Sequence, residues 1–454
     1  MADRIGTLVI LGASGDLTKR LLLPGLGELL DSGKGGDLEL LGVGQGALTD
    51  EEWRARVGAS FASGKAGGTR SSAVARSTRY LQADVTKPDD LRRVLEACHG
   101  TPALYFALPP RVTIAACSAL SSVELPEGTV FGLEKPFGTD LKSAQALNRQ
   151  LLTLVPEQDI HRIDHFLGKA TVLNLLGLRF ANRVFEQIWN ADNVERVEIV
   201  FDEQLALEGR AGYYDRAGAL IDMVQSHLLL LLALVAMEPP SSIDADDLRG
   251  SIAQLLRATE AWGGDPARAS RRARYTAGTI GERSIPAYVD EKGVDPTQET
   301  ETLVELTLGV QNWRWAGVPF VLRSGKALAH SRQEIVVTFK DVPHLPTGLN
   351  GRLAPAQLRI SLSPAGISLD LNINGERDPF TLERVTVDAE FAPGAYMPYG
   401  EILAGILSAD PTLSVRDDAV EQCWRIVTPI LEAWKSGAVP LQEYRAGSEG
   451  PTSW

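Results

Sequence analysis

A histidine at the start of a strongly apolar run is the first residue whose type and position point to chemistry. Residues 212–237, GYYDRAGALIDMVQSHLLLLLALVAM, predict a buried helix that carries Asp222 and His227. Buried ionisable groups need a reason. Because an imidazole titrates near neutral pH, His227 is the candidate general base. Asp222 lies about 140° from it on a regular helix, so one pocket takes both only if it wraps the helix or the helix is irregular.

A second polar group lies in the string RIDHFLGK, residues 162–169. His165 and Lys169 are four residues apart, so we expect them to share a helical face and to converge as donors on an anion. Asp164 is about 100° around an ideal helix from His165, so its carboxylate orients a different group. A lone histidine is often structural, yet Asp-His followed by lysine at this spacing also fits a phosphate site.

Lys135 belongs to the string EKPFG, residues 134–138, which directly follows an expected strand. That order places the lysine at the carboxyl edge of a parallel sheet, where ligands of open α/β folds collect. There it reaches a phosphate, a sugar hydroxyl or a cofactor. The alternative is a solvated lysine before a turn-forming proline.

Two glycines, Gly12 and Gly15, lie in the string GASGDLT between the strand expected at 7–11 and a helix that starts near Asp16. Such a turn directs backbone amides and a helix N-terminus toward a bound phosphate, and glycine allows close approach. A glycine turn between strand and helix is also common without any ligand. Its place after the first strand favours a dinucleotide site.

We expect these residues to lie in a chain of two domains, the first of the α/β class and the second of the α+β class. In the first third, short apolar runs alternate with helical patterns, which predicts a Rossmann-type, doubly wound parallel sheet over residues 1–163. Over residues 164–454 successive strands without intervening helices predict an antiparallel sheet covered by helices, which forms the second domain. Helices are expected at 168–180, 213–236 and 415–434, and loops at 262–301.

Composition excludes several classes of function. The formal net charge of the 454 residues is -13, which argues against a nucleic-acid binder or a binder of anionic membranes. Three scattered cysteines suit neither a disulfide framework nor a metal site, and they fit the reducing cytoplasm. The start of the chain does not resemble a signal peptide, and the apolar run 227–237 is shorter than the ~20 residues that span a bilayer.

Taken together, the strings resemble the glucose-6-phosphate dehydrogenase family over nearly the whole chain. RIDHFLGK followed downstream by D-x-x-Q-x-H is highly specific. The family's marks are GASGDLT (12–18), YFALPP (105–110), EKPFG (134–138), RIDHFLGK (162–169), LRFANRVFEQIWN (178–190), GYYDRAGALIDMVQSH (212–227), WAGVPFVLRSGKAL (315–328), WRIVTPILEAW (424–434) and AGSEGP (446–451).

The resemblance implies a role for each candidate residue. His227 is the general base that takes the proton of the anomeric hydroxyl while hydride leaves that carbon for a nicotinamide, and Asp164 holds its imidazole in the right tautomer. The implied substrate contacts are His165, Lys169, Lys135, Glu203, Asp222 and Lys326. The implied dinucleotide contacts are Gly12, Ser14, Gly15, Asp16, Leu17, Gln45, Asp84, Val85, Pro109 and Lys135.

Three departures from the family's pattern stand out. The usual tyrosine of RIDHYLGK is Phe166, and the usual QNH triplet contains Ser226. After the second strand, Gln45 occupies the place of the arginine that clamps the 2′-phosphate of NADP, and glutamine cannot replace its paired charge-assisted bonds. We therefore expect relaxed specificity, with NADP favoured by the family and NAD also accepted. Lys19 or Arg20 is a candidate to compensate.

The family implies the first oxidative step of the pentose phosphate pathway in a cytoplasmic homodimer or homotetramer without a metal. One alternative is a Rossmann oxidoreductase of a nonphosphorylated sugar or inositol, which needs no convergent phosphate site. The other is a catalytically silent paralogue that binds dinucleotide or sugar phosphate.

Overall fold

The computed structural model describes residues 5–209, 211–351, 353–391, 394 and 396–454, and these fall into two compact units. Unit 1 comprises Met1–Leu173, Pro239–Ala253 and Gly394–Trp424, and unit 2 comprises Asn174–Glu238, Gln254–Pro393 and Arg425–Trp454. Residues 1–4, on which the expectation about a signal peptide partly rests, lie outside the described residues. The domain boundary expected between residues 163 and 164 stays a prediction, because each compact unit is made of separate segments of the chain.

The described part of unit 1 contains a parallel sheet of six strands in the order β3-β2-β1-β4-β5-β6. This order is typical of dinucleotide-binding Rossmann folds, so the predicted fold class of the first domain is confirmed. The strands are β1 Thr7–Leu11, β2 Glu39–Gly44, β3 Arg79–Gln82, β4 Pro102–Phe106, β5 Val130–Glu134 and β6 Ile160–Ile163. The first helical segments are η1 Thr18–Leu22, α1 Leu23–Asp31, α2 Asp50–Ser63, α3 Thr69–Ser77, α4 Pro88–Glu96, α5 Pro110–Leu120 and α6 Leu141–Leu152.

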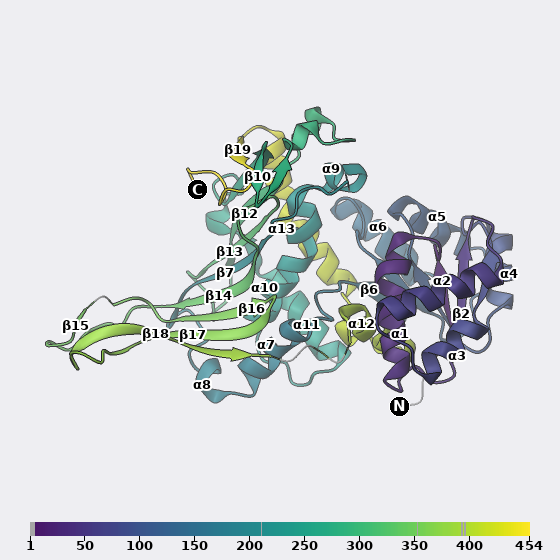
Figure 1. Ribbon diagram of the computed structural model, residues 1–454, viewed down its shortest axis with the longest axis horizontal. Coiled ribbons are helices and arrows are strands. Elements are labelled where there is room, and N and C mark those ends of the chain that lie inside the picture. Colours follow the sequence, from purple (N-terminus) through teal and green to yellow (C-terminus); the bar gives the residue numbers. More distant parts are fainter. Residues whose placement is uncertain (1–4, 210, 352, 392–393, 395) are drawn as a thin grey trace. The chain divides into compact units, whose positions relative to one another are not determined.

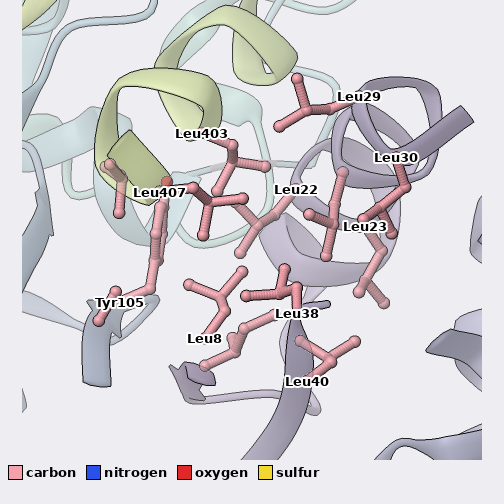
Figure 2. Close-up of a cluster of buried hydrophobic side chains, with 14 of the residues drawn as sticks. Leu8, Leu22, Leu23, Leu29, Leu30, Leu38, Leu40, Tyr105, Leu403 and Leu407 are labelled. Atoms are coloured by element: carbon pink, nitrogen blue, oxygen red, sulfur yellow. The ribbon is translucent and has the colours of Figure 1, made fainter. Parts of the chain in front are cut away.

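A leucine-rich core joins α1 to a helix from much later in the chain, α12 Pro398–Ser408. Leu403 and Leu407 of α12 lie against leucines of η1, α1 and the first two strands, as Figure 2 shows. In α1 the buried leucines recur three to four residues apart, which gives one apolar face. Burying that face removes apolar surface from water and fixes α12 in unit 1.

The described part of unit 2 is built on an eleven-stranded mixed sheet, mostly antiparallel, with the order β15-β18-β17-β16-β14-β7-β13-β12-β9-β19 and β8 paired to β12. This confirms the predicted antiparallel sheet, and the β13–β7, β19–β9 and β15–β18 pairs are the parallel exceptions. Strands β14, β16, β17 and β18 run side by side in Figure 1. The strands are β7 Val194–Asp202, β8 Thr259–Ala261, β9 Ser270–Thr276, β12 Leu303–Val310, β13 Pro319–Gly325, β14 Arg332–Phe339, β15 Asn350–Gly351, β16 Gln357–Leu362, β17 Ala365–Asn374, β18 Thr381–Glu390 and β19 Leu441–Arg445.

The prediction that residues 262–301 form loops is wrong. Strand β9 lies in this region, and β10 Gly278–Ile280 pairs with β11 Arg283–Ile285. Strand β9 reads SRRARYT, and its partners β12 and β19 come later in the chain. Because sheet neighbours override local propensity, polar composition alone did not reveal the strand.

The apolar helical run predicted at 213–236 is confirmed as α9 Ala211–Ala219, η3 Leu220–Leu228 and α10 Leu229–Ala236. By length and composition it is the one candidate membrane span among the described residues, and 89% of its most apolar window is buried inside the molecule. Three buried side chains bind the last carbonyls of α10: Arg179 donates to Leu234, Trp189 to Val235 and Trp315 to Ala236. They satisfy carbonyls that a helix end leaves without internal partners, so this run is a core helix.

The other helices include α7 Ala170–Phe180, α8 Arg183–Glu186, α11 Ala245–Arg257 and α13 Asp417–Lys435. The last helix, expected at 415–434, is thus confirmed within two residues. The helix expected at 168–180 begins only at Ala170, which changes the geometry of the string before it.

Candidate active site

The first candidate site is the glycine turn after β1. Gly12 has φ 91°, and a Cβ there would lie 2.2 Å from the carbonyl oxygen of Ala107. The amides of Gly12 and Ala13 both donate to Val43 at 2.9 Å, and helical structure begins at Asp16 as predicted. A bare backbone followed by a helix N-terminus fits the phosphates of a dinucleotide.

The predicted adenine side is organised around Asp84, at the carboxyl end of the sheet. Its carboxylate accepts bonds from the hydroxyl and the amide of Thr86 at 2.7 and 3.1 Å, and these bonds, followed by one from the Gln45 side chain, lower the pKa of Asp84. Val85 is buried, whereas Pro109 is exposed before α5. The Gln45 side chain thus lies near Asp84, and the Gln82 side chain donates to the Gln45 carbonyl at 2.9 Å.

Residues 164–169 form a turn, so the prediction that His165 and Lys169 share a helical face is wrong. The amides of Leu167, Gly168 and Lys169 each donate to the carbonyl three residues earlier, and the Asp164 carboxylate accepts the amide of Phe166 at 3.0 Å. An Asp side chain that bonds the backbone two residues on favours a turn over a helix.

Within this turn each cationic candidate contacts an aromatic ring. The His165 ring stacks on Tyr399, with 5.9 Å between centroids and 12° between planes, and the Lys169 ammonium lies 3.6 Å from the centroid of Phe166. Cation–π contact holds an ammonium in place without neutralising it. The ring of Phe166 therefore positions Lys169, although it lacks the hydroxyl of the family's tyrosine.

A carboxyl group beside Lys135 has a strongly shifted pKa. Desolvation raises the pKa of Glu134 to about 7, although hydrogen bonds from Tyr105 and Tyr399 oppose that shift, and the nearby charge of Asp164 raises it further. Tyr399 thus links Glu134 to His165 within unit 1.

In unit 2 the predicted substrate residues gather at the start of the apolar helix run. The Lys326 ammonium forms an ion pair of 2.7 Å with Glu203 and lies 5.4 Å from the ring of Tyr214. Burial, and after it the charge of Asp222, raises the pKa of Tyr214. Lys326 and Asp222 therefore lie near one buried tyrosine, and Glu203 is joined to them through Lys326.

Asp222 and His227 lie in a π-helix, not in a regular α-helix. Hydrogen bonds in a π-helix join residues five apart, so these two side chains are roughly one turn apart on the same side. This is the irregular helix that a shared pocket requires. His227 itself is 1% exposed.

The π-helix begins at a break occupied by Glu301. Gly218 has φ 63°, and a Cβ there would lie 2.2 Å from an oxygen of Glu301. The same carboxylate accepts the amide of Leu220 at 2.9 Å, and desolvation raises the pKa of Glu301 to about 7. Glu301 therefore caps the helical segment that carries His227.

Two family models together match residues 9–174 and 176–454. They are described as glucose-6-phosphate dehydrogenase, NAD binding domain, and glucose-6-phosphate dehydrogenase, C-terminal domain. The chain belongs to the glucose-6-phosphate dehydrogenase family.

Individual members of the glucose-6-phosphate dehydrogenase family match along their full length. Glucose-6-phosphate 1-dehydrogenase of Treponema pallidum (strain Nichols) is 38% identical over 477 residues, covering 98% of this chain and 92% of the relative. The crystal structure of the Mycobacterium avium enzyme is 32% identical, with a TM-score of 0.86 and coverage of 100% of this chain and 96% of the other. A structure titled as the dehydrogenase in complex with glucose-6-phosphate is 28% identical, with a TM-score of 0.88 and coverage of 100% and 97%.

Each unit brings part of the family's predicted residues together. Unit 1 holds Asp164, His165 and Lys169 in one turn, and unit 2 holds Glu203 and Lys326 in one ion pair. The pairing of Asp164 with His227 joins residues of different units and stays a prediction. Among the described residues, no group of three or more His, Cys, Asp or Glu side chains is placed to share a metal ion.

Sequence reasoning missed several residues that shape these sites. Tyr399 comes from α12, far along the chain, and no spacing connects it to RIDHFLGK. Tyr214 stands inside a string already singled out, where its place before Asp222 was a usable signal. The others are Glu134, Tyr105 and Glu301.

Proposed function

We propose that this chain oxidises glucose 6-phosphate at C1 to 6-phosphogluconolactone with hydride transfer to NAD(P), the first oxidative step of the pentose phosphate pathway. The observation that carries this function is the match of both family domains along the chain, with family members at 38% identity over 98% of it. A glucose-6-phosphate-bound structure of the same fold supports the substrate.

His227 acts as the general base. Its imidazole removes the proton of the anomeric hydroxyl, the C1–H bond breaks with its electron pair, and a C=O bond forms, which gives the lactone. The dinucleotide supplies the hydride acceptor when bound. The buried position of His227 on the π-helix supports this role, because a base in a dry site exchanges its proton with the substrate and not with bulk water.

Asp164 orients that imidazole and stabilises it once protonated. It is 1% exposed, and its turn geometry is fixed by the amide of Phe166. A buried carboxylate held in this way suits the orientation of a cation better than the binding of a mobile ligand.

The sugar phosphate is bound by His165 and Lys169, with Lys326 as a helper. Glu203 and Asp222 accept hydrogen bonds from the sugar hydroxyls, and Lys135 bridges substrate and cofactor. The ring contacts of His165 and Lys169 support their part, because they hold both side chains in place within one turn of unit 1.

The cofactor is NADP, with NAD also accepted. The glycine turn supports dinucleotide binding, since the space a Cβ would fill at Gly12 is closed by backbone. The proposed contacts are Gly12, Ser14, Gly15, Asp16, Leu17, Gln45, Asp84, Val85, Pro109 and Lys135. We expect the kcat/KM ratio of the two dinucleotides to stay below ~10³, because no arginine stands at Gln45.

The protein works as a cytoplasmic homodimer or homotetramer, with residues 1–163 as the dinucleotide domain and 164–454 as the domain for substrate binding and assembly. Light scattering of the purified chain tests the assembly, and a monomer would contradict it.

The test is a steady-state assay of glucose 6-phosphate and of glucose, each with NAD and with NADP. We expect reduction of both dinucleotides only when the 6-phosphate is present. Equal activity with glucose would favour a dehydrogenase of nonphosphorylated sugars. Thermal stabilisation by both ligands without any reduction would show a silent paralogue.

A further inference from the structure

An arginine of α2 lies at the edge of the predicted cofactor site. Helix α2 follows β2 directly, and both belong to unit 1 (Figure 1). Nη1 of Arg56 lies 3.4 Å from the carbonyl oxygen of Ser14, in the glycine turn. The guanidinium therefore lies beside the loop that binds dinucleotide phosphates in this fold.

The end of β2 lies at the same edge. The hydroxyl of Tyr80 donates to the carbonyl of Gly46 at 2.9 Å, and a Cβ on Gly44 would lie 2.7 Å from that hydroxyl and 3.7 Å from Oγ of Ser14. Burial raises the pKa of Tyr80, and the positive charge of Arg56 partly offsets this. Tyr80 and Ser14 thus lie against the end of the second strand, and Arg56 reaches this edge through its bond to Ser14.

The charge of Arg56 is available to a ligand. The carboxylate of Glu52, one helical turn earlier, is bound by the amide and the hydroxyl of Thr49 in a capping box, and the charge of Arg56 adds the smallest contribution to the lowered pKa of Glu52. Among the residues that the structure describes, no carboxylate oxygen lies within 4.0 Å of the Arg56 guanidinium. Arg56 is partly exposed, so an anion reaches it from solvent.

The neighbouring arginines are engaged elsewhere. Arg54 donates to the carbonyl of Thr78 at 3.0 Å and pairs with Asp50, and Arg20 pairs with Asp16 at 3.4 Å. The Gln45 side chain lies near Asp84 and contributes to the lowered pKa of that carboxyl group.

We propose that Arg56 is the specificity-determining cation of this chain, which binds the 2′-phosphate of NADP in place of the arginine that Gln45 replaces. In Rossmann folds the residue after the second strand and a nearby arginine decide between a ribose 2′-hydroxyl and a 2′-phosphate. Here the guanidinium comes from the following helix. The inference rests on the proposed use of a nicotinamide dinucleotide.

Calorimetric binding of 2′,5′-ADP and 5′-AMP to the full chain tests this inference without turnover. The two ligands differ only in the 2′-phosphate, so the ratio of their affinities isolates that contact. We expect Arg56→Ala to weaken 2′,5′-ADP about tenfold or more and to leave 5′-AMP within about twofold, because one charge-assisted phosphate contact is lost. Arg76→Ala, on the exposed surface of α3, removes the same charge and should leave the ratio unchanged.

Three results would overturn the inference. The first is that Arg56→Ala leaves the ratio of the affinities for 2′,5′-ADP and 5′-AMP unchanged. The second is that Arg56→Ala weakens both ligands equally, which marks a structural role. The third is that Arg20→Ala, and not Arg56→Ala, lowers this ratio. In each of these cases the chain would still reduce NAD or NADP with glucose 6-phosphate, so the proposed function would not be affected. Failure of the wild type to reduce either dinucleotide would instead refute the proposed function.

Discussion

The two units position their chemical groups in different ways. Unit 1 presents Lys135, Asp164 and His165 on loops and turns that follow strands of a parallel sheet, whereas unit 2 carries His227 on a helix made irregular at Gly218. Each unit also contains a carboxyl group whose pKa desolvation raises to about 7, Glu134 and Glu301. On the roles proposed for these residues, unit 1 binds the phosphate from turns on a regular scaffold, and unit 2 places the base on a local distortion, beside substrate contacts of its own.

The largest expected effect comes from removing the base. His227→Asn should lower kcat ~10²–10⁴-fold while the affinity for glucose 6-phosphate stays nearly constant, because the phosphate contacts remain. Steady-state kinetics together with calorimetric substrate binding measure both quantities. A matching loss of affinity would show that His227 itself holds the substrate in place.

A substitution at Gly218 tests whether unit 2 needs the break before the helix that carries His227. Gly218→Ala should lower the free energy of unfolding by about 2–4 kcal/mol, since the residue has positive φ and its Cβ would collide with Glu301. Urea denaturation followed by circular dichroism measures the change. Gly177→Ala, in α7 with no atom within 4 Å of the new Cβ, is the control and should not destabilise. Equal stability of the two variants would show that the break is not required.

Lys169 tests the binding role of unit 1. Lys169→Ala should weaken glucose 6-phosphate about tenfold or more and leave kcat at saturation within a few-fold, because the phosphate loses a cation and the base remains. Initial rates over a wide substrate range separate KM from kcat. If this variant instead behaves like His227→Asn, the division between the units is wrong.

The smallest effect concerns pH and Glu134. Its pKa is raised from the ordinary 4.5 to about 7, so its stabilising contribution is full below about pH 4.5 and is lost as the pH rises through about 7. Between pH 5 and pH 8 the free energy of unfolding should fall by about 1–3 kcal/mol less in Glu134→Gln than in the wild type.

Denaturant titrations at several pH values measure that slope. Glu301→Gln should give a similar flattening, because its pKa is raised by the same cause. Glu51→Gln, exposed on α2, is the control. An unchanged slope in Glu134→Gln would show that its carboxyl group does not titrate in this range.

Much of the fold and of unit 1 could be predicted from the sequence. The glycine turn and EKPFG follow short apolar strands, and in a parallel sheet the ends of such strands share one edge. The helical face predicted for His165 and Lys169 is wrong, because a spacing of four residues fits both a helix and a turn. The bond that the Phe166 amide donates to Asp164 decides between them only in three dimensions.

The irregular helix could not be predicted in full. Spacing showed that Asp222 and His227 need an irregular helix to face one pocket, but its cause is a contact between Gly218 and Glu301, 83 residues apart (301 minus 218). Tyr399 joins His165 from an even more distant helix. Contacts of this kind depend on tertiary packing, which periodicity along the chain does not encode.

Whether Asp164 orients the imidazole of His227 is decided by a double-mutant cycle of Asp164→Asn and His227→Asn, followed by kcat with glucose 6-phosphate. Residues that act as one unit are strongly non-additive. We predict that Asp164→Asn alone lowers kcat by about 10²-fold or more, and that the double variant is within a few-fold of His227→Asn. Losses that multiply in the double variant would contradict a base oriented by Asp164.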